Sequence, residues 1–136
     1  MIHPSSAQIA ARIEELYGAP LNELEAHIQD QPPGMLAALL GSHHTLAFAE
    51  QRITVHRERL QQLVHPERQT GAAEVLHILD CAQRLAESVA VRDTQSATIQ
   101  AVLQSLVRTP APETPSGPAQ APAAVPAPAV PAAPGR

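Results

Sequence analysis

The residues best suited to metal or catalytic chemistry in this 136-residue chain are seven histidines and one cysteine. Glu74 and His77 form an E-x-x-H pair, which is half of the motif that carboxylate-bridged di-iron helical bundles use. Such a centre needs a second E-x-x-H pair, and no other glutamate of this chain has a histidine three residues later. The histidines also lack the spacing of a zinc site. We therefore expect no metal ion and no other cofactor.

Covalent catalysis is not indicated by the remaining reactive groups. Cys81 falls in the middle of a predicted helix, beside Asp80 and Ala82, where no cationic neighbour and no helix N-terminus would activate its thiol. The six glycines are isolated, so the sequence contains no phosphate-binding loop and no dinucleotide fingerprint. Lysine is absent, which removes Schiff-base chemistry. The sequence therefore predicts that the protein is not an enzyme.

Four arginines near the predicted turn between two long helices are candidate contacts for phosphate or nucleic acid: Arg52, Arg57, Arg59 and Arg68. Glu58 and Glu67 dilute this positive charge, and the whole chain carries a net charge of −4. Proteins that bind a duplex present a basic face, and single-stranded nucleic acid stacks on aromatic residues, of which this chain has only Tyr17 and Phe48. Nucleic-acid binding through this Arg-bearing tip is therefore the alternative hypothesis and not the main one.

Three polar residues on the first long helix also share a seven-residue spacing: His43, Glu50 and Arg57. Residues with this spacing lie on one face of a helix, and here that face adjoins the apolar stripe described next. Two interpretations stay open at this point. The three residues form a polar ladder inside an interface, or they flank the apolar stripe with their stems packed and their polar ends in water.

Two apolar ladders with a seven-residue spacing predict a pair of long helices. The first comprises Leu39, Leu46, Ile53 and Leu60, and the second comprises Val75, Ala82 and Val89, with Ile78 and Leu85 interleaved. Such a repeat keeps one stripe of a helix against one neighbour, as in a coiled coil. The connector His65–Gly71 contains Pro66, which ends the first of these helices. The pattern is typical of an antiparallel helical hairpin.

Residues 1–108 are expected to form one domain with helices at about 5–17, 20–31, 35–64 and 71–107. Ser5 and Gln8 match a capping box at the start of the first helix, and Gly18 matches a helix C-terminus. Gly41 and Asp93 are the positions at which the two long helices could kink, and the sequence leaves that question open.

The predicted fold is therefore all-α. A long antiparallel hairpin joins two short N-terminal helices in a small three- to four-helix bundle at one end, and it continues as a bare two-helix arm at the other end. Folding the hairpin about residues 67–68 brings Glu50 opposite Arg84 and Arg57 opposite Asp80. We expect an ion pair at each of these positions.

Residues 109–136 contain nine prolines and nine alanines without an apolar period, which predicts a disordered Pro/Ala-rich tail. The N-terminus lacks the basic stretch and apolar run of a secretion signal, and no segment is apolar enough to span a membrane. The single cysteine cannot form an internal disulfide. Abundant arginine, alanine and proline without lysine fit a GC-rich bacterial gene, and we expect a cytoplasmic protein.

Phe48 and Val55, again seven residues apart, lie on the opposite side of the first long helix from its apolar ladder. Either an N-terminal helix covers this second stripe or another chain does, and an exposed stripe would mark a partner surface. We therefore expect a non-enzymatic helical interaction protein that self-assembles or binds a protein partner through its helix faces. In general style the chain is similar to small accessory subunits, adaptors and chaperones of bacteria and phages. The sequence does not specify the partner, the pathway or the oligomer number.

Overall fold

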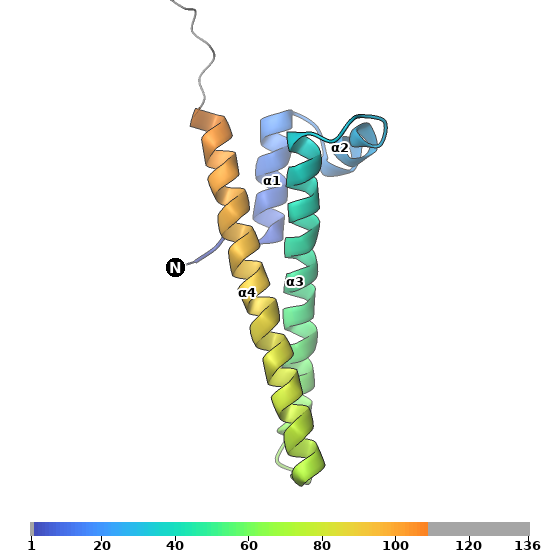
Figure 1. Ribbon diagram of the computed structural model, residues 1–136, viewed down its shortest axis with the longest axis vertical. Coiled ribbons are helices and arrows are strands. Elements are labelled where there is room, and N and C mark those ends of the chain that lie inside the picture. The colour runs from blue at the N-terminus through green and yellow to red at the C-terminus, as the bar shows by residue number, and fades with distance from the viewer. Residues whose placement is uncertain (1, 109–136) are drawn as a thin grey trace, which may run out of the picture. The chain divides into compact units, whose positions relative to one another are not determined.

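The computed structural model describes residues 2–108, and the regular structure in this part of the chain is entirely helical. The four helices are α1 (Ser6–Tyr17), α2 (Leu21–Ile28), α3 (Met35–Leu63) and α4 (Ala72–Arg108) (Figure 1). The predicted all-α class is confirmed, and each predicted helix end lies within three residues of the observed one. The predicted tail, residues 109–136, lies outside the described residues.

The short N-terminal helix α1 begins and ends where its capping residues require. The Ser5 side chain accepts a hydrogen bond from the Gln8 backbone N–H, and the Gln8 side chain accepts one from the Ser5 backbone N–H at 2.8 Å. This reciprocal pair is the predicted capping box. At the other end Gly18 adopts a φ of +72°, the left-handed conformation that glycine tolerates best, and its N–H donates to the Glu14 carbonyl at 2.8 Å.

The hairpin of α3 and α4 has two continuous helices. α3 has 29 residues and α4 has 37, which correspond to lengths of about 45 and 55 Å at 1.5 Å per residue. The sequence left open whether these helices kink at Gly41 or Asp93, and both residues are helical and lie inside these segments. The helices run antiparallel beside each other, and the Cys81 thiol of α4 donates to the His56 carbonyl of α3 at 3.3 Å (Figure 1).

The hydrophobic core lies at the end of the hairpin where α1 and α2 pack. Its buried members come from all four helices: Ile9, Ile13, Leu24, Leu39, Leu40, Leu46, Ile99 and Leu103. Beyond this core, within residues 2–108, α3 and α4 pack only on each other, with Leu63 and Cys81 buried between them. The predicted arrangement of a small bundle at one end and a two-helix arm at the other is therefore confirmed. None of the helices in the described part of the chain is long and apolar enough to cross a membrane.

The buried stripe of α4 differs from the prediction in the arm. Val75 was expected to face α3, but its side chain is 42% exposed. The buried positions of this half are Cys81 and Ser88, each one residue before the expected Ala82 and Val89. The physical reason is the change of neighbours along α4, because the helix faces both α1 and α3 in the bundle but only α3 in the arm. The buried stripe therefore turns towards α3 as the arm begins.

Neither predicted ion pair across the hairpin forms, so that prediction is wrong. Glu50 accepts hydrogen bonds from Ser6 of α1 instead of meeting Arg84. Asp80 pairs with Arg84, one turn away on the same helix, at 2.9 Å, and not with Arg57. In both cases another donor occupies the carboxylate, Ser6 of a different helix for Glu50 and Arg84 of the same helix for Asp80. An (i, i+4) partner on one helix is already in reach, whereas a partner on a second helix must be placed by the register.

Candidate functional site

Two polar residues of α3 hold the start of α1 on one side of the hairpin. Glu50 accepts hydrogen bonds from Ser6, at 2.8 Å from its backbone N–H and also from its hydroxyl group. His43 Nε2 donates to the Ser6 carbonyl at 3.1 Å. From α4 the buried Ser96 hydroxyl donates to the Pro4 carbonyl at 2.6 Å. The polar-ladder interpretation thus holds for His43 and Glu50, which lie inside an interface.

No other helix of the described part of the chain covers the opposite side of the hairpin along α3 and α4. Three side chains of α3 that face α1 or the core are those of His43, Leu46 and Glu50. Two positions after each of them, and therefore roughly 200° around the helix, come Thr45, Phe48 and Arg52. These three residues therefore lie on the side of α3 that α1 does not cover. Together with residues of α4 they line a groove between the two helices, which we call the open groove.

The upper part of the open groove, nearer the bundle, is mostly apolar, although Thr45, Arg52 and Glu87 also line it. Ala49 and Ser88 are buried and form its floor, while Phe48 of α3, 58% exposed, and the exposed Val91 of α4 flank it. The hollow between them has a volume of about 250 Å³. The Arg52 guanidinium lies over the Phe48 ring, 5.7 Å from its centroid, which is the distance of a cation–π contact.

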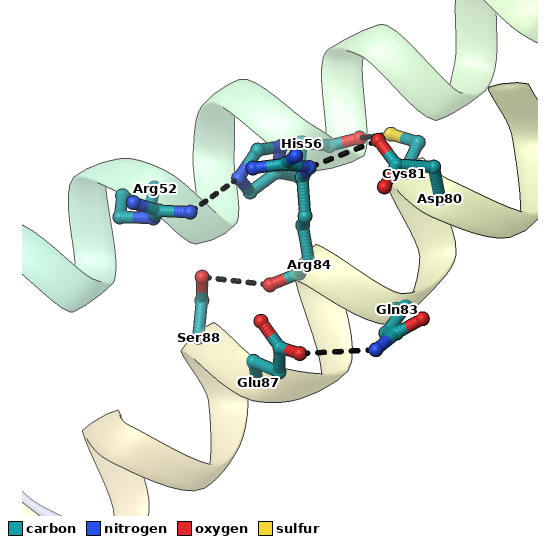
Figure 2. A network of polar contacts seen from close by, with 8 residues as sticks. All are labelled: Arg52, His56, Asp80, Cys81, Gln83, Arg84, Glu87 and Ser88. Atoms are coloured by element: carbon teal, nitrogen blue, oxygen red, sulfur yellow. Dashed lines mark hydrogen bonds and ion pairs between the residues drawn. The ribbon is translucent and has the colours of Figure 1, made fainter.

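The lower part of the open groove is polar (Figure 2). Arg52 donates to His56 Nε2 at 3.4 Å, and Arg84 pairs with Asp80. The hydrogen bond to Asp80, with the negative charge of that carboxylate, raises the pKa of Arg84 above its usual value. A second hollow of about 250 Å³ follows here, and its lining residues are His56, Arg59, Leu63, His77, Asp80, Cys81 and Arg84.

The predicted partner-binding residues are exposed, as a partner surface requires, but only one of them lines the open groove. Phe48 borders the upper hollow, whereas Val55, 51% exposed, lies outside both hollows. The interpretation that the first helix covers these two side chains is therefore wrong, because α1 packs on the other side of α3. Cover by another chain stays a prediction.

The four candidate arginines do not form one patch. Arg52 and Arg59 line the open groove. Arg57 is exposed and follows Glu50 by seven residues, so it lies on the side of α3 that carries α1. Arg68 belongs to the connector, where its N–H donates to the His65 carbonyl at 2.9 Å.

The residues singled out for metal or thiol chemistry have structural partners. The Glu74 carboxylate accepts a hydrogen bond from the Gly71 N–H at 2.8 Å, next to the start of α4, while His77 lines the open groove. Cys81 is buried and bonded to a carbonyl. Within residues 2–108, no three histidine, cysteine, aspartate or glutamate side chains are grouped so that they could hold a metal ion.

A second surface was not predicted from the sequence. The face of α4 that points away from the core consists of Ala72, Leu76, Leu79, Gln83, Ala86, Ala90, Thr94, Ala97 and Ala101, and all nine are exposed. We call it the outer face of α4. Its signal was present in the spacing, because Leu76, Ala90 and Ala97 share one seven-residue phase. That phase lies about 100° around the helix from the ladder that was assigned to the core, because Gln83 and Ala90 each follow a ladder residue by one position.

No protein-family model matches the chain, and neither a curated protein nor a solved structure matches it.

Proposed function

We propose that this chain is a non-enzymatic helical interaction subunit that binds one amphipathic helix of a protein partner in the open groove. The observation that carries the proposal is the groove itself, which has buried small residues, Ala49 and Ser88, between the exposed Phe48 and Val91. In helical bundles the groove between two antiparallel helices is filled by a further helix. α1 fills the groove on one side of this hairpin, and the partner helix would fill the other side.

The two parts of the groove define the chemistry of the partner. The upper hollow, between Phe48 and Val91, favours an apolar anchor, and small floor residues let the partner backbone come close. The lower hollow presents Arg59 and two histidines, and its Asp80 carboxylate is already paired with Arg84, which favours acidic side chains in the partner. Phe48 and Arg59 are about 16 Å apart along α3, so one helix of about three turns would span both hollows. The expected ligand is therefore a short helix with apolar anchors at one end and carboxylates at the other.

This proposal fits the role of an accessory subunit, an adaptor or a small chaperone in a bacterial cytoplasm. The arginine-rich, lysine-free composition supports the bacterial source.

Site-specific photo-cross-linking of the full chain in its native host tests this function. A photoreactive amino acid at Thr45, which lines the groove, should give a covalent adduct of one defined mass, and the same label at the exposed Gln51 of α3 should not. Val91→Arg should abolish the adduct because its charge enters the apolar hollow, and Val55→Arg is the matched control outside the groove. Equal adducts from both labels, or an adduct insensitive to Val91→Arg, would exclude the groove as the binding site.

The alternative function is a nucleic-acid-associated regulator. The arginines at Arg52 and Arg59 support it because they line one groove, but Asp80 and Glu87 line that groove too and reduce its positive charge. Retention on RNA or DNA at low salt that is lost steeply with added salt, and weakened by Arg59→Gln, would support the alternative. A photo-adduct that digestion shows to be nucleic acid would do the same.

A further inference from the structure

The outer face of α4 is unusual for the exposed side of a helix because none of its nine side chains is charged. A solvent-exposed helix face normally carries charged and polar residues. Here Leu76 and Leu79 are 66% and 59% exposed, and alanine supplies five of the other seven positions. The nearest charged residues of the helix, Asp80, Glu87 and Asp93, lie beside this face and not within it. An uncharged strip with large exposed leucines indicates a surface that another helix covers.

We propose that a second copy of this chain covers this face, with the two α4 helices antiparallel and related by a two-fold axis near residue 88. The observation behind the choice is a match of size and polarity along the face. The axis gives the pairs Leu76 with Ala101, Leu79 with Ala97, Gln83 with Thr94 and Ala86 with Ala90. Each leucine meets an alanine, each amide meets a hydroxyl, and small residues meet at the centre.

The size match decides between the two directions in which the helices could pair. A parallel pair would put the leucines of one copy against the same leucines of the other, and alanines against alanines further along. The helix axes would then have to be far apart at one end and close at the other. In the antiparallel pair a large side chain packs on a small one at each end, so the two helix axes stay evenly spaced over the whole length. Isologous pairing of this kind is the commonest symmetry of homodimers.

The polar pair at Gln83 and Thr94 fits the same register. The Gln83 amide nitrogen donates to the Glu87 carboxylate of its own helix at 3.2 Å. Its amide oxygen is therefore directed to accept a hydrogen bond, and the Thr94 hydroxyl of the second copy can donate one. This pair occurs twice in the dimer, at equal distances from the axis, and it would set the register of an otherwise apolar seam.

The area of the face is just under the lower limit for a specific dimer. The strip from Ala72 to Ala101 is about 45 Å long at 1.5 Å per residue, and a helix is about 10 Å wide. Two such strips give roughly 900 Å² of footprint, close to the lower size of specific interfaces at about 1,000 Å². The outer face lies on the side of α4 away from α3, so the proposed dimer leaves the open groove accessible.

Light scattering on the full chain tests the dimer. We expect a mass of twice the 14.4 kDa of one chain. The double variant Ala86→Glu, Ala90→Glu places four carboxylates around the two-fold axis, and it should be monomeric with unchanged helicity, since both sites are exposed and glutamate favours helix. The control with the same added charge is Gln51→Glu, Gln61→Glu, at exposed sites of α3, and it should stay dimeric. The proposal is overturned if the wild type is monomeric, or if the two double variants have the same mass.

Disulfide trapping tests the direction of the helices. Leu79→Cys and Ala97→Cys chains should cross-link when mixed, and neither should cross-link with itself, because each engineered cysteine would lie about 27 Å from its own copy across the axis. The native Cys81 is buried, and the wild-type chain run in parallel shows its background. Self-cross-linking of each variant alone would show a parallel pair and overturn the antiparallel register. The photoreactive amino acid at Thr45 lies in the open groove and not on the outer face of α4, so these variants should not change its adduct. A failure of the dimer proposal can therefore be distinguished from a failure of the proposed partner binding.

Discussion

Glu50 and Ser6 form a link of two hydrogen bonds between the N-terminal helix and the hairpin, although 44 residues separate them in the sequence. Both carboxylate oxygens are used, one by the Ser6 backbone N–H at 2.8 Å and the other by the Ser6 hydroxyl. Ser6 is the first residue of α1, so its N–H is one of the groups that has no partner inside its own helix. A side chain of α3 therefore completes the cap of α1 and fixes its position along the hairpin.

Glu50→Ala should lower the free energy of unfolding by about 1–2 kcal/mol, the usual loss when a helix cap is removed. Glu50→Gln keeps one acceptor oxygen and should lose less. Urea denaturation of the two variants beside the wild type measures the difference through the midpoint, with the slope unchanged. Equal midpoints for Glu50→Ala and the wild type would show that the carboxylate does not stabilise α1.

Ser96→Ala should also destabilise the fold, by about 0.5–1.5 kcal/mol, because the Pro4 carbonyl would lose the hydrogen bond that the buried Ser96 hydroxyl donates. Thr98→Ala, two residues further along α4 and exposed, is the matched control and should change little. Thermal unfolding followed by circular dichroism measures both. If the two variants melt together, the contact between Ser96 and Pro4 contributes nothing to stability.

Local signals made the helix ends predictable, whereas contacts between distant residues were not. Ser5, Gly18 and Pro66 act within one turn of their own positions, and each lies at or next to a helix end. The contact between Glu50 and Ser6 joins two helices, and no spacing in the sequence relates them. The buried stripe of α4 in the arm was predicted one residue too late, at Ala82 instead of Cys81. The seven-residue pattern indicates that a helix has an apolar stripe, but it does not indicate which helices pack on that stripe and so which of its residues become buried.

The candidate surfaces show the same limit. The spacing of Phe48 and Val55 predicted a second apolar stripe on α3, on the side away from its ladder. The hollow beside Phe48 was not predictable, because its other wall is Val91 of another helix. The uncharged outer face of α4 could have been found from the sequence alone. It was hidden because the inner ladder of α4 already explained one apolar phase, and alanine contributes little to an apolar pattern.

Leu63→Ala should loosen the arm without melting the bundle. Leu63 is buried where only α3 and α4 pack, so the cavity has few neighbours and its effect stays local. Amide hydrogen exchange should speed up in the arm, near Leu63 and Cys81, and stay slow around Ile13. Leu103→Ala lies in the main core and should lower global stability by about 2–5 kcal/mol. Uniform acceleration of exchange by Leu63→Ala would mean that arm and bundle unfold as one unit.

The double variant Phe48→Ser, Val55→Ser should keep its helicity and lose about 1 kcal/mol of stability or less. Both side chains are more than half exposed, so little buried area is removed, and the contact that disappears is the one between the Phe48 ring and Arg52. Guanidinium denaturation measures the stability, and light scattering shows whether the mass changes. Since the proposed dimer uses the outer face of α4, the mass should stay that of the wild type, while the photo-adduct from Thr45 should disappear. A loss of several kcal/mol would instead mean that these two side chains are buried by this chain in solution.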